Sequence, residues 1–109
     1  EVSHPFYLGS FDDNPSDFYL FRCMDRDGTS CAVDGLPGPG VVAAGADKRW
    51  VVVKLNTPEG VRYHYFQRNA HETRGWGIYP PDVAAGPIDE AQYLAAKARL
   101  VLPAFTVEP

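Results

Sequence analysis

The sequence predicts an α+β fold in which an antiparallel β-meander of about four to five strands precedes one C-terminal helix, at about residues 90–101, that packs on it. Three observations support this prediction. Apolar runs in the first two thirds of the chain are short and are separated by clusters of Gly, Pro, Asp and Asn. One run alternates polar and apolar residues, as a half-buried strand does. An Ala-rich segment near the C-terminus follows a helix start signal.

The bulk composition indicates a single globular domain over residues 1–109. Apolar residues make up 45% of the chain and charged residues 22%, proportions typical of a folded protein. The longest apolar runs are only a few residues, so no membrane span is expected. Residues 1–17 are expected to form an irregular N-terminal arm that contains a short strand at Phe6–Leu8.

The first hairpin has a register that the sequence can specify. The loop Arg26-Asp27-Gly28, which ends on an Asp-Gly pair that favours a turn, lies between an aromatic run at 18–24 and a short run at 31–33. This loop places Cys23 directly opposite Cys31, at a separation of roughly 4.5 Å that a disulfide can span. The sequence therefore predicts a Cys23–Cys31 disulfide and an oxidising compartment. The alternative is two reduced thiols in a cytosolic protein.

Two further hairpins follow the rigid, Pro- and Gly-rich connector at residues 35–40. Strands at 41–45 and 50–55 flank a polar turn, and a second turn at 56–60 precedes a strand at 61–67. The run at 50–53 lacks alternation, which predicts a central strand buried on both faces. The strand at 61–67 alternates. One face consists of Val61, Tyr63 and Tyr65, and the other of Arg62, His64 and Phe66.

Residues 68–87 are expected to form a long loop, because they contain three Gly and three Pro and show no sustained periodicity. A short strand at residues 77–79 is the alternative. The loop carries residue types that are enriched at binding hot spots. The candidate binding residues are Arg68, His71, Arg74, Trp76 and Tyr79. An equally weighted interpretation is that Trp76 folds back and plugs one end of the sheet.

The helix start is the clearest local signal. Asp89 at the N-cap places Gln92 at the third helical position, as in a capping box, and Ile88 and Tyr93 form a hydrophobic staple around it. The first helical residue is therefore expected to be Glu90. The residues available for a buried stripe are Tyr93, Leu94, Ala98, Leu100 and Val101.

No catalytic site, metal site or cofactor is predicted. The three histidines, His4, His64 and His71, are scattered and show no helical i, i+4 pairing of the kind that binds metals. Residues 25–30 resemble part of a calcium loop but lack its distal Glu, so a turn is the better interpretation. His71 with Glu72, or His64, leaves open an alternative: a small enzyme or ligand-binding protein with a pocket between the sheet and loop 68–87.

The net charge of −4 argues against nucleic acid as a partner and favours a basic protein. Asp12, Asp13 and Asp17 are the residues expected to steer such a partner. The chain begins at Glu1 without an initiator Met or signal peptide, which is consistent with a secretory or lipoprotein leader having been removed. The sequence does not specify an oligomeric state.

Three segments together resemble a known class of protein. They are Val-Val-Ala-Ala-Gly-Ala-Asp-Lys-Arg-Trp-Val-Val-Val-Lys at 41–54, Tyr-His-Tyr-Phe at 63–66 and Gly-Pro-Ile-Asp-Glu-Ala-Gln-Tyr at 86–93. Over residues 41–100 the chain is similar to small, functionally uncharacterised bacterial envelope domains of the lipoprotein type, with Asp89 in place of their usual Thr. The resemblance implies a bacterial origin and an envelope location, and it transfers no site residue.

The sequence therefore predicts a non-enzymatic protein-binding domain of the bacterial envelope that acts as an inhibitor or immunity-type partner of another protein. We expect it to be periplasmic or secreted, with a cytoplasmic location as the alternative. A purely structural subunit of an envelope assembly is a third interpretation, which would require a broad exposed apolar patch.

Overall fold

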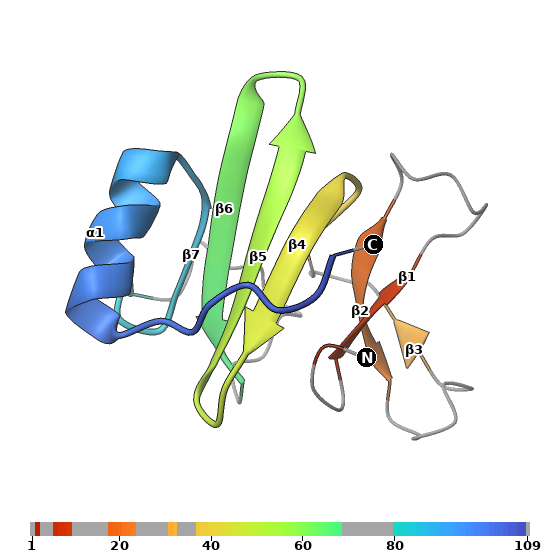
Figure 1. Cartoon of the computed structure of the whole chain (residues 1–109), viewed down its shortest axis with the longest axis horizontal. Helices are drawn as coiled ribbons and strands as arrows, with labels where there is room; N and C mark the ends of the chain where they lie inside the picture. The colour runs from red at the N-terminus through yellow and green to blue at the C-terminus, as the bar shows by residue number, and fades with distance from the viewer. Residues whose placement is uncertain are drawn as a thin grey trace.

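In the computed structural model, residues 2, 6–9, 18–23, 31–32, 37–68 and 80–108 are described, and they contain seven strands and one helix. The elements are β1 (Phe6–Gly9), β2 (Tyr19–Cys23), β3 (Cys31–Ala32), β4 (Val41–Ala46), β5 (Trp50–Thr57), β6 (Gly60–Gln67), β7 (Ala84–Ile88) and α1 (Glu90–Leu100). Strands β1-β2-β3 form an N-terminal sheet and β4-β5-β6-β7 a central sheet, with consecutive strands as antiparallel neighbours (Figure 1). This confirms the predicted α+β meander with a C-terminal helix, although the sequence pattern did not separate the two sheets.

The central sheet is the middle layer of the molecule, between α1 on one face and the N-terminal sheet on the other (Figure 1). Strand β5 shows this directly, because Trp50 and Val52 belong to the cluster under α1 while Val51 and Val53 belong to the opposite cluster. All four side chains are buried. The prediction of a central strand covered on both faces is therefore confirmed.

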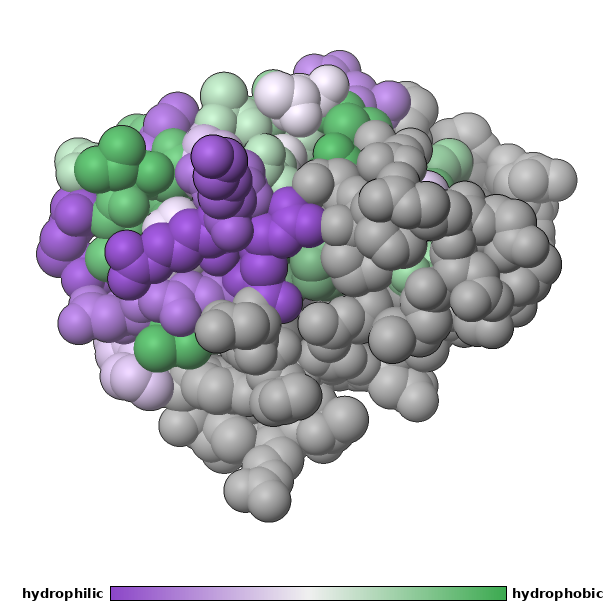
Figure 2. Space-filling view, turned by 90° about the horizontal axis from the view of Figure 1, so that it is seen from below, coloured by the Kyte–Doolittle hydropathy of each residue, from purple (hydrophilic) through white to green (hydrophobic). Residues whose placement is uncertain are grey.

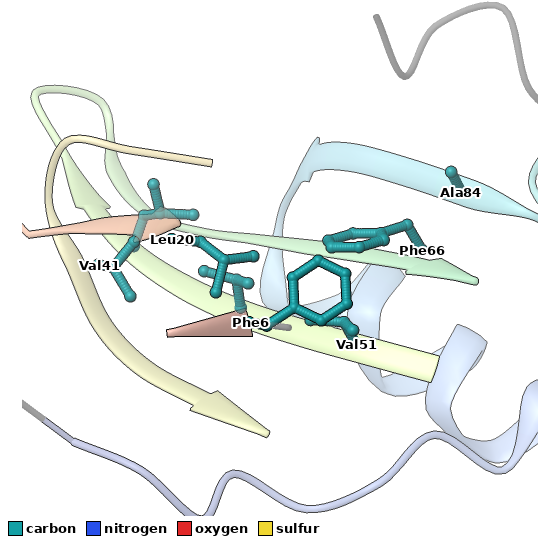
Figure 3. Packing of buried hydrophobic residues seen from close by; sticks show 8 residues of the cluster. Phe6, Leu20, Val41, Val51, Phe66 and Ala84 are labelled. Carbon is teal, nitrogen blue, oxygen red and sulfur yellow. The ribbon is translucent and has the colours of Figure 1, made fainter. Parts of the chain in front are cut away.

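The cluster between the sheets joins the first strand to the rest of the chain. Phe6 of β1 meets Phe66 of β6 edge to face, with ring centroids 5.5 Å apart. Leu20 of β2 packs into the same cluster as Val41 and Val51 (Figure 3). The expected strand in the N-terminal arm is thus present as β1, and it buries an aromatic anchor.

The cluster under α1 corrects the predicted buried stripe of the helix. Tyr93 and Ala96 are buried, whereas Leu94 is 54% exposed and Val101 is 78% exposed. The physical reason is the stacking of Tyr93 on Tyr63, whose ring centroids lie 4.4 Å apart. That contact turns residue 93 toward the sheet, so the small Ala96 one turn later fits where the helix approaches β6 closely.

The helix boundaries follow the predicted signals. Asp89 accepts a hydrogen bond from the Gln92 amide at 2.8 Å, and the Gln92 side chain accepts one from the Asp89 amide at 3.1 Å. This is the capping box, and it fixes Glu90 as the first helical residue. Val101 ends the helix in the left-handed conformation with φ 57°.

No helix in the described residues has the length and apolarity that a membrane crossing requires.

The register of the first hairpin is the predicted one. Cys23 of β2 is the direct partner of Cys31 of β3, and Arg22 is the partner of Ala32. The loop residues Arg26-Asp27-Gly28 lie outside the described residues. The pairing therefore confirms the strand alignment that the turn chemistry predicted.

Strand β7 corrects the predicted loop 68–87. Residues 84–88 pair with β6, with Ala85 opposite Tyr65 and Ile88 opposite Tyr63, and a bulge lies between these pairs. Small residues, Gly and Pro have low strand propensity, so this segment gives no strand signal by itself. Pairing with β6 and burial of Ala84 determine its conformation.

The C-terminal segment covers the outer edge of β4. The Ala44 amide donates to the Val107 carbonyl at 2.8 Å, and the amides of Thr106 and Val107 donate to the Ala44 carbonyl at 2.9 Å. Without this cover, an edge strand would present unpaired backbone groups. Gly45 lies under the same segment, where a Cβ atom would overlap the carbonyl oxygen of Ala104.

Candidate functional site

The tip of the β4–β5 hairpin is held by its own aspartate. One carboxylate oxygen of Asp47 accepts hydrogen bonds from the Arg49 amide at 2.8 Å and the Trp50 amide at 2.7 Å. The Asp47 amide donates to the Trp50 carbonyl at 3.0 Å, which closes the turn. Side-chain-to-backbone bonds of this kind stabilise a tight turn. Lys48 and Arg49 are consequently presented on a fixed backbone.

Arg68, at the end of β6, is attached to that hairpin tip. Its amide donates to the Arg49 carbonyl at 2.9 Å, and its guanidinium donates to the Asp47 carbonyl at 2.9 Å. The guanidinium carbon also lies 5.7 Å from the ring centroid of Phe6, within the range of a cation–π contact. Arg68 therefore holds a defined position between the hairpin, β6 and the N-terminal sheet.

A surface hollow of about 320 Å³ lies at this end of the central sheet, lined by Lys48, Arg49, Gln67 and Arg68. Of the described residues that line it, Lys48, Arg49 and Arg68 are cationic. Figure 2 views this end of the molecule and shows hydrophilic side chains gathered there. A concave surface lined by cations and an amide suits an anionic group, since carboxylates and phosphates accept hydrogen bonds from both.

Two carboxylates of the described residues near the hollow, Asp47 and Asp82, have partners of their own. Asp47 uses its carboxylate on backbone amides of its own turn. Asp82, whose backbone carbonyl accepts from the Gln67 amide group at 3.4 Å, forms an ion pair with Arg99.

The charge is also distributed unevenly along the chain. Residues 1–36 carry seven acidic and two basic residues, a net −5, whereas residues 37–109 carry seven acidic and eight basic, a net +1.

Of the predicted binding residues, the structure places Arg68 in this hollow. His71, Arg74, Trp76 and Tyr79 lie outside the described residues, so their assignment stays a prediction. Asp12, Asp13 and Asp17, expected to steer a basic partner, also lie outside them, as do His4 and Glu72. Within the described part of the chain, no group of three or more potential metal ligands occurs.

The sequence analysis did not predict three of the lining residues as site residues. It interpreted Lys48 and Arg49 as turn residues and Gln67 as the end of a strand. The signal that could have identified them is the meander register. Trp50 pairs with Gln67, so the hairpin tip must lie against the residues that end β6. If each turn had been considered together with the end of the next strand, Lys48 and Arg49 would have been placed beside Gln67 and Arg68.

His64, the histidine assigned to the alternative function, is held against β7. Its Nδ1 atom is buried and has no hydrogen-bond partner among the described residues. Its ring leaves no room for a Cβ atom at Gly86. Burial lowers the pKa of His64 to about 4, so the ring is neutral at pH 7.

Comparisons with protein-family models, with curated proteins and with solved structures found no match for this chain.

Proposed function

We propose that the chain is a non-enzymatic protein-binding domain of the bacterial envelope, acting as an inhibitor or immunity-type partner of another protein. The observation that carries the proposal is the cationic hollow formed by Lys48, Arg49, Gln67 and Arg68. Its backbone is fixed by the Asp47 turn and by the bonds of Arg68, so little ordering is needed on binding. Such a surface favours an acidic segment of the partner, in place of the basic partner that the net charge of the whole chain suggested.

Arg68 is the expected anchor of the interface. Arginine is enriched at interface hot spots because its guanidinium can bind a carboxylate in two places while its plane contacts aromatic rings. In this chain the group is already oriented by the Asp47 carbonyl and the Phe6 ring. The exposed Lys48 and Arg49 supply attraction at longer range, which raises the association rate and makes it sensitive to salt.

A matched pair of double variants tests this proposal. The immobilised wild-type chain, a Lys48→Glu/Arg49→Glu variant and a Lys54→Glu/Arg62→Glu variant are incubated with bacterial envelope extract, and retained proteins are identified by mass spectrometry. Both variants change the net charge by −4, but only the first reverses the hollow. We expect at least one protein retained by wild type and by the Lys54→Glu/Arg62→Glu control and reduced at least tenfold on the Lys48→Glu/Arg49→Glu chain. Identical retention on all three would contradict the proposal.

A small-molecule ligand is the second candidate, because a hollow of about 320 Å³ is within the range of ligand sites. Amide chemical shifts can separate the two. A hexaglutamate peptide is expected to shift the amides of Lys48, Arg49 and Gln67, whereas inorganic phosphate at the same concentration should shift them less. Stronger perturbation by phosphate would favour the ligand-binding interpretation.

The envelope location rests on the resemblance over residues 41–100 and on a proposed Cys23–Cys31 disulfide. The two residues are direct partners across β2 and β3, and Cys23 is buried and not a free thiol. We expect no thiol to be alkylated in protein recovered without reductant, and a mass 2 Da below that of the reduced chain. Reduction should lower the free energy of unfolding by about 2.5 kcal/mol. Two alkylated cysteines would favour the cytoplasmic alternative.

A further inference from the structure

Arg99, in the last turn of α1, lies next to the cationic hollow. The side-chain amide of Gln67, which lines the hollow, donates a hydrogen bond to the backbone carbonyl of Asp82 at 3.4 Å. The carboxylate of the same Asp82 forms an ion pair with Arg99. The polar surface of the hollow therefore continues through Asp82 to a further cation.

Two aromatic rings of the cluster under α1 connect Arg99 with Arg49. The Arg49 guanidinium carbon lies 5.4 Å from the centroid of the Trp50 ring, and this ring meets Tyr65 edge to face, with centroids 5.8 Å apart. Burial raises the pKa of the Tyr65 hydroxyl, and the neighbouring Arg99 guanidinium opposes that rise. Arg49 and Arg99 therefore flank one pair of rings. An extended segment of about six residues spans about 20 Å, which is enough to reach both guanidinium groups.

The ion pair between Asp82 and Arg99 can be exchanged at little cost. The Arg99 side chain is 51% exposed and the Asp82 side chain 75% exposed, so water screens both charges and the pair contributes little to stability. A carboxylate of an incoming acidic segment can replace Asp82 on the guanidinium, which binds either carboxylate in the same way. The released Asp82 carboxylate is then hydrated. Asp82 consequently competes with an acidic partner for Arg99.

We propose that Arg99 is a further binding residue of the cationic hollow, and that Asp82 occupies its guanidinium until a carboxylate of the acidic partner replaces it. The inference rests on the proposed function, because it assigns the same acidic segment to the same surface. In the complex the segment crosses Gln67, with one carboxylate in the hollow and another on Arg99. Competition from Asp82 lowers the affinity for every acidic ligand, and a segment with several carboxylates overcomes it by binding the hollow at the same time.

Titration with hexaglutamate at fixed ionic strength, followed by nuclear magnetic resonance, tests the proposal. We expect the peptide to shift the Nε–Hε signal of Arg99 together with the backbone amides of the hollow. Asp82→Asn keeps the shape of the side chain but removes the competing carboxylate, so it should raise the affinity about fivefold, whereas Arg99→Gln should lower it about threefold. Glu59→Gln, in the β5–β6 turn at the opposite end of the sheet, changes the net charge as Asp82→Asn does and should alter the affinity less than about twofold. Circular dichroism checks that each variant is folded.

The double variant Asp82→Asn/Arg99→Gln separates competition for Arg99 from a general effect of charge. If Asp82 acts through Arg99, the gain from Asp82→Asn should fall below about twofold once the guanidinium is absent. A gain that persists in the Arg99→Gln chain, or equal gains from Asp82→Asn and Glu59→Gln, would overturn the inference. Shifts at the hollow without a shift at Arg99 would also overturn it, and they would leave the proposed function intact. No shift at the hollow would contradict the acidic partner itself, and this inference with it.

Discussion

The Gly45→Ala variant is expected to lose about 2–3 kcal/mol of unfolding free energy, although it adds a single methyl group. A Cβ atom at this position would overlap the carbonyl oxygen of Ala104 and lie 3.2 Å from the Cα atom of Phe105. Both contacts are to backbone, so no side-chain rotation can relieve them. The C-terminal segment must move outward, which strains its hydrogen bonds with Ala44. Urea denaturation measures the loss, and hydrogen exchange at Thr106 and Val107 should report the displacement.

Shortening the chain after Pro103 provides the control for this prediction. Removal of the segment costs stability of its own, because Phe105 packs against the cluster under α1. In the shortened chain, however, the new methyl group meets no carbonyl oxygen of Ala104. Alanine is also a better strand residue than glycine, so Gly45→Ala should then be neutral or slightly stabilising. A loss of equal size in both backgrounds would show that the overlap with Ala104 is not the cause.

Features encoded by a few neighbouring residues were predictable from the sequence. Asp89 and Gln92 form the capping box that their spacing in the sequence predicted. The pairing of Cys23 with Cys31 follows from a turn of defined length and from the twofold alternation of strands. In each case the determining contacts lie within about ten residues of one another. Local chemistry is therefore sufficient for these features.

Features that depend on distant contacts were not predictable in the same way. From hydrophobicity alone, Leu94 is expected to be buried in preference to Ala96. The stacking of Tyr93 on Tyr63 instead sets the rotation of the helix and leaves Leu94 exposed. Residues 84–88 become a strand only because β6 offers them a partner. Arg68 was identified by residue type, whereas Lys48 and Arg49 join it only once Trp50 is paired with Gln67. The candidate site is a product of sheet register, which composition does not reveal.

His64 gives the protein a pH dependence of stability that one substitution should remove. The pKa of this ring is lowered by burial from its ordinary value of 6.5 to about 4 in the folded state. Between these values the unfolded chain binds a proton that the folded chain does not. The contribution of the neutral ring to the free energy of unfolding is therefore fully present above pH 6.5, and it is lost as the pH falls toward 4. Over that window the loss amounts to about 3 kcal/mol, at about 1.4 kcal/mol per unit of pKa.

The His64→Phe variant isolates this contribution. An aromatic ring keeps the packing against Gly86, and it removes the buried Nδ1 atom that has no hydrogen-bond partner. Carboxylates titrate alike in both proteins, so the difference between the two stability curves reports His64. We expect the variant to equal or exceed wild type at pH 7 and its advantage to grow by about 3 kcal/mol when urea denaturation is repeated near pH 4.

A direct titration of the ring by nuclear magnetic resonance completes the test. A midpoint near 4 in the folded protein would establish that protonation is opposed by the fold, as the contact with β7 requires. A midpoint near 6.5 would mean that the ring is hydrated in solution and that β7 does not cover it. In that case the stability curves of wild type and His64→Phe should run parallel, because neither state of the wild-type chain would then bind the proton preferentially. The two measurements must therefore agree, and disagreement between them would point to a second titrating group.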